Sequence, residues 1–426
     1  MPSQFETPSG VRFRCSRCGD CCRNFEILLG PGEAESLATL DWSDKEPSLV
    51  GAETTTGAGI AGRKDLRRLA RRDDGACIYL DEDQGCRIHH HFGGDAKPLM
   101  CRLYPFGFYA VGERTAVDVS FACRAVSEAS GPSLERQVPE WTRWIEASPN
   151  AVAPLPQPRL DRHRKISADL LWELEHALLA FLERRGEPLL DRVRCMLQFV
   201  RVATTGDPTT ATAASLRQAM AAGLPGQIAR QPSEATCDKT QRAVFFQWLF
   251  LALDPVLEDP RQGTPAERRE SARRHERASR GYLQRRGAPQ VAGEPLDTTF
   301  EAIAQAEAGV LTEAVADETL ATWLRAKIVG QRFLSAGGKD LPFIDAVRKL
   351  LVAYPMALWT AKALACHRGV GGPELGDLRA AIRRIDRTLG RVPVSRLPRK
   401  QAKVFDFILL ETDLVEAAVN DVLAGR

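Results

Sequence analysis

The stretch Phe13-Arg-Cys15-Ser-Arg-Cys18-Gly-Asp-Cys21-Cys22-Arg23 decides the organisation of this chain, because it places four cysteines in the pattern Cys-x2-Cys-x2-Cys-Cys. A buried cysteine is otherwise a small apolar filler that occurs singly, so packing does not explain this density. Thiolates two residues apart can turn toward one soft centre, and Gly19 permits the tight, partly left-handed backbone that such a loop needs. The run therefore predicts a bound metal.

The remaining cysteines are distributed unevenly along the chain. The N-terminal residues Met-Pro-Ser-Gln-Phe-Glu-Thr contain no basic stretch followed by an apolar segment, so we expect no secretory signal and a cytoplasmic protein. A reducing compartment disfavours disulfides and favours metal ligation. Cys195, Cys237 and Cys366 fall in helical patterns and are expected to be buried filler. The predicted metal ligands are Cys15, Cys18, Cys21, Cys22, Cys77, Cys86, Cys101 and Cys123.

Length and composition limit the classes of protein that this chain can be. With 426 residues, 44% hydrophobic and 27% charged, it reads as a soluble globular protein of two or three domains. A net charge of +3 argues against strong bulk attraction to nucleic acid or to a membrane surface. The most apolar run, 243–253, is shorter than the ~20 residues that cross a bilayer. We expect no membrane span and no nucleic-acid partner.

The hydrophobic pattern predicts an α+β fold in two parts. Short strands and loops dominate residues 1–148, which form the predicted metal-binding domain, and prolines mark a stiff linker that follows. In the second predicted domain, 159–426, apolar residues recur at three and four positions, which is typical of helices. Helices are predicted near 170–181, 189–202, 240–253, 317–335, 342–366, 375–389 and 400–423.

Two hairpins are predicted in the first part. Segments 76–80 and 86–89 would pair around a polar turn and bring Cys77 near Cys86. Segments 108–111 and 115–121 flank Gly112-Glu113, which suits a type II′ turn, and the second strand leads to Cys123.

Residues 261–286 contain nine arginines and three glutamates, with almost no apolar stripe. A helix that is polar on all sides is usually exposed to solvent. We therefore expect a basic exposed arm rather than a nucleic-acid site, and an acidic protein or RNA partner is the alternative that the charge leaves open.

The chain resembles the CxxCxxCC cysteine-cluster family, a zinc- or iron-chelating domain, over about a third of its length. It departs from the family pattern at His89, where tyrosine is usual, at Lys97, where arginine is usual, and in the extra residues 90–95. The segments that carry the resemblance are Cys15-x2-Cys18-x2-Cys21-Cys22, Cys77-Ile-Tyr-Leu80, Cys86-Arg-Ile88 and Lys97-Pro98-x2-Cys101-Arg102-Leu-Tyr104-Pro105-Phe106.

The remainder is similar in pattern and order to flagellin lysine-N-methylases, chiefly in residues 320–334 and 343–365. This resemblance implies transfer of a methyl group from S-adenosylmethionine to a lysine of a protein substrate, and it assigns no catalytic residue. The alternative is a non-catalytic metal carrier, sensor or scaffold.

Two kinds of metal centre fit the cysteine spacing. Zinc would need closed tetrahedra of four thiolates, and eight cysteines suffice for two. An iron–sulfur cubane would take Cys15, Cys18 and Cys21 with Cys86 or Cys101, and the ferredoxin-like spacing favours this cluster.

Other side chains near these cysteines are candidates for supporting roles. Arg102 and Tyr104 are candidate cofactor-binding residues, because they could donate hydrogen bonds to sulfur or to a bound carboxylate. His90 and His91 are expected in an exposed loop, whereas His89, close to Cys86, is a candidate ligand.

Overall fold

The computed structural model describes residues 4–57, 66–148, 151–155, 157–161, 163–205, 235–253, 264–291, 294–334, 341–388 and 413–425. Contacts divide the chain into two compact units. The cysteine-rich unit comprises Arg12–Gly107 and Cys123–Val152, and the helical unit comprises Met1–Val11, Phe108–Ala122 and Ala153–Arg426. The division into domains 1–148 and 159–426 stays a prediction. Both units in the structure contain segments from before residue 148.

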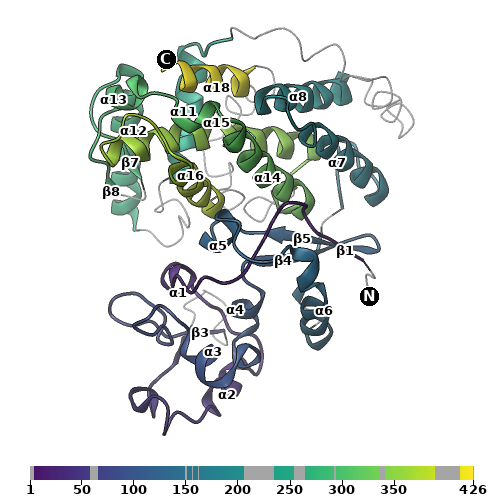
Figure 1. Cartoon of the computed structure of the whole chain (residues 1–426), viewed down its shortest axis with the longest axis vertical. Helices are drawn as coiled ribbons and strands as arrows, with labels where there is room; N and C mark the ends of the chain where they lie inside the picture. Colours follow the sequence, from purple (N-terminus) through teal and green to yellow (C-terminus); the bar gives the residue numbers. More distant parts are fainter. Residues whose placement is uncertain are drawn as a thin grey trace. The chain divides into compact units, whose positions relative to one another are not determined.

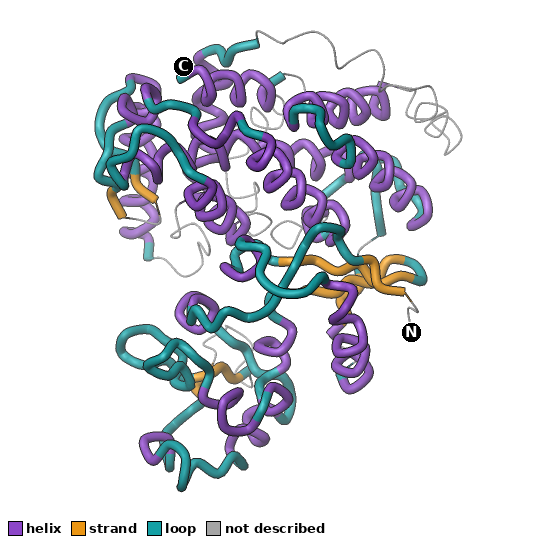
Figure 2. The backbone as a smooth tube through the Cα atoms, viewed as in Figure 1, coloured by secondary structure: helices purple, strands orange, loops and turns teal. Residues whose placement is uncertain are grey.

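The mixed α+β class predicted from the sequence is confirmed. Short helices, short strands and loops make up the cysteine-rich unit, whereas long helices dominate the other (Figure 2). In the cysteine-rich unit, β2 and β3 pair antiparallel with Thr55 opposite Leu69. Its elements are α1 (Asp20–Asn24), α2 (Glu33–Ala38), β2 (Thr55–Gly57), β3 (Arg67–Leu69), α3 (Arg87–Phe92), α4 (Leu99–Leu103), α5 (Arg124–Ser127) and α6 (Val138–Ala147), with 3₁₀ turns at Pro47–Leu49, Gly94–Ala96 and Leu134–Gln137.

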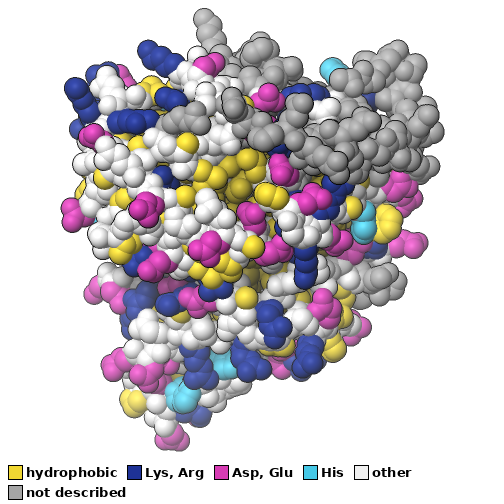
Figure 3. All heavy atoms as spheres, turned by 45° about the horizontal axis from the view of Figure 1, so that its top comes forward, with side chains coloured by type: hydrophobic (Ala, Val, Ile, Leu, Met, Phe, Trp, Pro, Cys, Tyr) yellow, Lys and Arg dark blue, Asp and Glu magenta, His cyan; other side chains and the backbone are white. Residues whose placement is uncertain are grey.

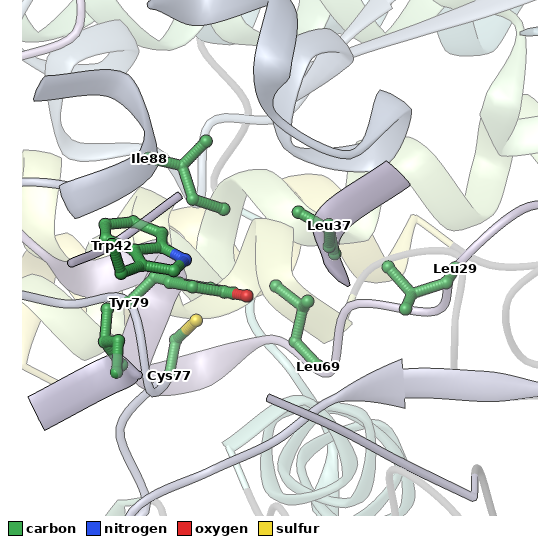
Figure 4. Packing of buried hydrophobic residues seen from close by; sticks show 8 residues of the cluster. Leu29, Leu37, Trp42, Leu69, Cys77, Tyr79 and Ile88 are labelled. Carbon is green, nitrogen blue, oxygen red and sulfur yellow. The ribbon is translucent and has the colours of Figure 1, made fainter. Parts of the chain in front are cut away.

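The cysteine-rich unit has a small aromatic and aliphatic core that includes one of the predicted ligands. The rings of Trp42 and Tyr79 stack with centroids 5.6 Å apart, and the Cys77 thiol lies beside them (Figure 4). Phe92 meets the Trp42 ring edge to face at 4.8 Å. The buried members of this core are Leu29, Leu37, Trp42, Leu49, Leu69, Cys77, Tyr79 and Ile88.

The first predicted hairpin is wrong, because segment 76–80 holds a turn between two isolated bridge residues and segment 86–89 leads into a helix. Single antiparallel bridges join Arg71 to Cys77 and Leu80 to Cys86, and the chain then enters helix α3 rather than a return strand. Ile88 and Phe92, four residues apart, lie on one helical face and contact the core. Because this face buries two apolar side chains, the histidines 89–91 belong to a helix and not to a loop.

A four-stranded sheet takes most of its residues from the helical unit. Its strand order is β1 (Gln4–Glu6), β5 (Arg114–Val119), β4 (Phe106–Val111) and β6 (Val152–Pro154), and β1 runs parallel to β5. The second predicted hairpin is confirmed: Gly112 has φ 58°, which is the left-handed backbone that glycine accepts at this turn position.

The helical unit is built around α15 (Phe343–His367), which is buried along most of its length and packs against α16 (Leu375–Thr388) and α18 (Leu414–Ala424) (Figure 1). The predicted helices are present where the structure describes them, although residues 389–412, which include the start of the last one, lie outside the described ranges. The other elements of this unit are α7 (Ala168–Leu182), α8 (Leu189–Thr205), α11 (Lys239–Leu253), α12 (Pro265–Gln284), β7 (Gln290–Val291), β8 (Glu294–Pro295), α13 (Phe300–Gln305) and α14 (Ala314–Gly330).

The arginine-rich stretch forms α12, which starts at a capping box between Thr264 and Glu267. Arg273, Arg277 and Arg280 are exposed, in agreement with a solvated basic face. The helix is not detached from the unit, because Tyr282 stacks on Phe246 of α11 with centroids 4.5 Å apart. Over the face in Figure 3, acidic and basic side chains are interspersed, as the small net charge leads one to expect.

Among the described helices, none combines the length and the apolar character that crossing a membrane requires.

A buried carboxyl group couples the stability of the helical unit to pH. Glu175 of α7 accepts a hydrogen bond from the Gln331 amide at 2.7 Å through Oε2. Burial raises the pKa of Glu175 well above its usual range, and the nearby carboxylate of Glu6 adds to the rise.

We predict that Glu175→Gln removes a pH dependence of stability. The folded-state pKa lies above the unfolded value of about 4.3, so the folded chain keeps a proton that the unfolded chain releases. The unfolding free energy of the wild type therefore falls as pH rises from about 4 through the folded-state pKa. The variant lacks this fall and should be more stable than the wild type at pH 7. The difference is about 1.4 kcal/mol for each pH unit between the unfolded-state pKa and the folded-state pKa, counted no further than pH 7.

Urea unfolding followed by circular dichroism at pH 4 and pH 7 measures the effect, with Glu113→Gln in the exposed hairpin turn as the control. The same pH dependence in wild type and Glu175→Gln would contradict the prediction.

Candidate metal centre

The Cys-x2-Cys-x2-Cys-Cys run is held in place by its own turn and by the loop before α3. Gly19 precedes α1 with φ 72°, and a Cβ there would lie 2.7 Å from Gln84 Oε1. Arg23 donates to the same oxygen from Nε at 3.2 Å and from Nη2 at 2.8 Å. Glycine at position 19 therefore serves both the left-handed turn and the close approach of Gln84.

Backbone hydrogen bonds join the run to Cys77. The Cys77 N–H donates to the Cys22 carbonyl oxygen at 2.9 Å. The guanidinium of Arg71 donates to the carbonyl oxygens of Arg23 at 3.0 Å and Phe25 at 2.7 Å. These bonds fix the backbone after the run, so the Cys22 and Cys77 side chains start from neighbouring positions.

Three other predicted ligands belong to short helices or directly precede them. Cys86 directly precedes α3 and Cys123 directly precedes α5, while Cys101 lies in the middle of α4. The Glu33 carboxylate accepts the Leu99 N–H at 2.6 Å, which ties α4 to α2. Exposed backbone N–H groups at a helix start favour a thiolate beside them.

The structure brings seven of the eight predicted ligands into one neighbourhood. Cys22, Cys86 and Cys101 pack against the core that contains Cys77. Cys21 interacts electrostatically with this group and also with Cys18 and Cys123. Cys21 is therefore close to two sets of thiols, one on the hydrophobic core and one formed by Cys18 and Cys123.

The environment opposes the charged form of most of these thiols when they stand alone. Burial raises the pKa of Cys77 to about 11 and that of Cys123 to about 12, and it raises the pKa of Cys18 and, strongly, that of Cys101. Repulsion from neighbouring thiolates adds to each rise.

Cys21 is the exception, because its sulfur is hydrogen-bonded to that of Cys22. Their sulfur atoms are 3.9 Å apart. The hydrogen bond with the Cys22 thiol lowers the pKa of Cys21 to about 7, and the same bond with burial raises the pKa of Cys22. Cys21 is thus the thiol of this pair that ionises first.

Three sulfur atoms already accept backbone hydrogen bonds that stabilise a thiolate. The Cys18 sulfur accepts from the Asp20 N–H, the Cys77 sulfur from that of Tyr79, and the Cys123 sulfur from those of Val126 and Ala125. A donor two residues after the cysteine recurs in all three cases. These N–H groups lower the pKa of the three thiols and so partly offset the effect of burial.

The donor set fits a thiophilic metal, although the side chains have not closed around one point. Within the described residues, no three Cys, His, Asp or Glu side chains are placed to hold one ion together. A cation among the thiols would remove the two costs identified above, since it neutralises the buried charge and the repulsion between sulfurs.

The remaining predicted residues are placed differently. Cys15 is exposed at the start of the run. His89 and His90 are exposed on α3, and His91 Nε2 is 3.5 Å from Glu46 Oε1. Outside the site, Cys195 and Cys237 are buried as predicted and Cys366 is partly buried.

Arg102 and Tyr104 flank the site through α4. The Tyr104 ring lies 5.0 Å from that of Phe25, immediately after the cysteine run. Arg102 Nε is buried, and among the described residues it has no hydrogen-bond partner. The guanidinium is therefore a candidate donor to a ligand.

Sequence reasoning missed two basic residues that act on this site. The Lys97 ammonium group lowers the pKa of both Cys21 and Cys101, and Arg71 holds the backbone after the run. Lys97 stands in the Lys-Pro-x2-Cys segment, where its place before Cys101 was the available signal. Arg71 belongs to a basic stretch of the sequence, and no pattern there distinguishes it from the neighbouring arginines.

Comparison with known proteins agrees with this donor set. Residues 14–124 match the CxxCxxCC family, whose description is "Putative zinc- or iron-chelating domain". No curated protein and no solved structure matches the chain. The resemblance to the cysteine-cluster family is confirmed, and the resemblance of the helical part to flagellin lysine-N-methylases stays a prediction.

We predict that Cys77→Ser and Cys101→Ser each lower the metal bound per chain by half or more, because each removes a buried thiol of the group. Cys195→Ser, which alters a buried cysteine of α8, is the matched control and should retain wild-type metal content. Plasma mass spectrometry of protein purified without oxygen measures the ratio. Wild-type metal content in both Cys77→Ser and Cys101→Ser would contradict the assignment.

Proposed function

We propose that the cysteine-rich unit holds an iron–sulfur cluster through its early cysteines, and that zinc is the alternative occupant. The observation that carries the proposal is the gathering of seven buried or half-buried thiols, from segments far apart in the sequence, near Cys21. A zinc- or iron-chelating role for residues 14–124 is its starting point.

The spacing of the early cysteines favours iron–sulfur over zinc. A single zinc ion and a single cubane each take four protein ligands, so the number of gathered thiols fits either centre. The spacing of Cys15, Cys18 and Cys21 matches a ferredoxin run, and N–H donors to sulfur are a means of tuning a cluster's potential.

The chain's own residues would act by charge and by exclusion of water. Lys97 offsets negative charge at Cys21 and Cys101, as the direction of its effect on their pKa indicates. Trp42 and Tyr79 cover the Cys77 side of the group with apolar surface. When bound, an iron–sulfur cluster supplies one-electron chemistry or an open iron for a ligand.

Anaerobic purification followed by iron, zinc and acid-labile sulfide analysis tests the proposal. We expect iron and sulfide in similar amounts. Zinc without sulfide would replace the cluster by the zinc alternative, and the absence of both metals would overturn metal binding itself.

Removal of the metal should unfold the cysteine-rich unit, because structural metal ions contribute on the order of 10 kcal/mol, comparable with the net stability of a domain. Limited proteolysis of the chelated protein should then cut within Arg12–Gly107 and spare α15 of the helical unit, which serves as the internal control. Protection of both units after chelation would contradict this expectation.

Methyl transfer from S-adenosylmethionine to a lysine-bearing protein is the second candidate. The buried Arg102 Nε favours it, because this group could donate to the carboxylate of such a cofactor beside the thiols. Isothermal titration of the metal-loaded protein with S-adenosylmethionine tests it, and we expect binding that Arg102→Gln weakens. No heat of binding in the wild type would leave a metal carrier, sensor or scaffold as the function.

A further inference from the structure

The residues before Cys123 are held by a buried carboxylate of the helical unit. Asp386 of α16 accepts the backbone N–H of Phe121 at 2.7 Å and that of Ala122 at 3.3 Å, both through Oδ2. The Ser120 hydroxyl oxygen is 3.5 Å from the same atom. Cys123 is the next residue in the chain, so its backbone begins at a point that Asp386 fixes.

Asp386 is itself held by a network of buried charges. Its Oδ1 accepts the Trp323 indole N–H at 2.8 Å and lies 3.0 Å from Lys327 Nζ. Lys327 also donates to the Val119 carbonyl oxygen at 2.6 Å and to Asp118 Oδ1 at 3.3 Å. The Asp118, Lys327 and Asp386 side chains are all buried.

The network allows the segment 118–122 little freedom. A buried carboxylate that loses its partners is strongly unfavourable, so a shift of this segment would leave Asp118 or Asp386 unpaired. Gly330 of α14 adds a steric limit, since a Cβ at this position would lie 2.5 Å from Asp118 Cα. Charge and close packing therefore specify one position for the end of β5.

The backbone on the far side of Cys123 is also fixed. The Ser127 N–H donates to the Cys123 carbonyl oxygen at 3.0 Å as α5 begins. The Cys123 sulfur accepts the N–H groups of Ala125 and Val126. Cys123 is thus a ligand candidate whose backbone is set on one side by α5 and on the other by Asp386.

We propose that Asp386 is a positioning residue for the metal centre, which acts through the backbone of Phe121 and Ala122 on Cys123. The inference rests on the proposed metal-binding function and deepens it, because it assigns to the helical unit a part in retaining the metal. By thermodynamic linkage, bound metal then stabilises the Asp386 network in return.

Asp386→Asn tests the inference in the full-length, metal-loaded protein. Asparagine has one acceptor oxygen where aspartate has two. Whichever way the amide is turned, its NH2 group faces either the two backbone N–H groups or the donors of Trp323 and Lys327. Substitutions that disturb the support of a metal ligand typically weaken binding by about tenfold or more. We expect about tenfold faster transfer of metal to a chromogenic chelator and a changed visible absorption spectrum of the centre.

Leu378→Ala is the matched control. Leu378 is fully buried two turns earlier on α16, so its truncation destabilises the helical unit by leaving a cavity without altering Asp386. We expect the control to lower the unfolding midpoint and to keep the wild-type spectrum and rate of metal release. Trp323→Phe, which removes one donor to Asp386, replaces Asp386→Asn if that variant does not fold.

The outcomes separate the inference from the proposed function. Wild-type protein that contains no metal would overturn both. Metal in the wild type, with release and spectrum unchanged in Asp386→Asn or in its substitute Trp323→Phe, would overturn the positioning role alone. Equal acceleration in Leu378→Ala would also overturn it, because general destabilisation would then explain the effect.

Discussion

The main constraint on the cysteine-rich unit is the free-energy cost of holding several thiols close together where burial excludes water. Each of Cys77, Cys101 and Cys123 is harder to ionise than a free cysteine, because burial removes water and neighbouring sulfurs repel. A cation relieves both effects at once. A gathering of thiols that is unfavourable for isolated thiolates is the arrangement in which a metal contributes most to folding.

The rest of the unit explains how that gathering is reached. Its hydrophobic core is small and takes in Cys77, with Cys22, Cys86 and Cys101 packed against it. Backbone bonds such as that from Cys77 N–H to the Cys22 carbonyl, and the side chain of Arg71, connect segments separated by about fifty residues. The unit uses few regular elements, so the metal would supply the cohesion that a larger core supplies elsewhere.

The helical unit, by contrast, is stabilised by an extensive hydrophobic core. Helix α15 is buried over most of its length, and its neighbours α16 and α18 cover it. Its buried Lys327 is surrounded by the carboxylates of Asp118 and Asp386. Through Asp386 this unit also holds the backbone of Phe121 and Ala122, which leads to Cys123.

The sequence by itself determined most of the long helices of the second part, the hairpin at Gly112 and the list of cysteines, because apolar periodicity, turn glycines and thiol spacing are local properties. It failed at Cys86–His89, where contact of Ile88 and Phe92 with the core selects a helix over a strand. Tertiary structure alone decided that Cys21 is close to two sets of thiols, that Arg71 holds the backbone after the run, and that Asp386 holds the chain before Cys123. The contact of Arg71 with Phe25 and that of Asp386 with Phe121 join residues 46 and 265 positions apart, so no local pattern records them.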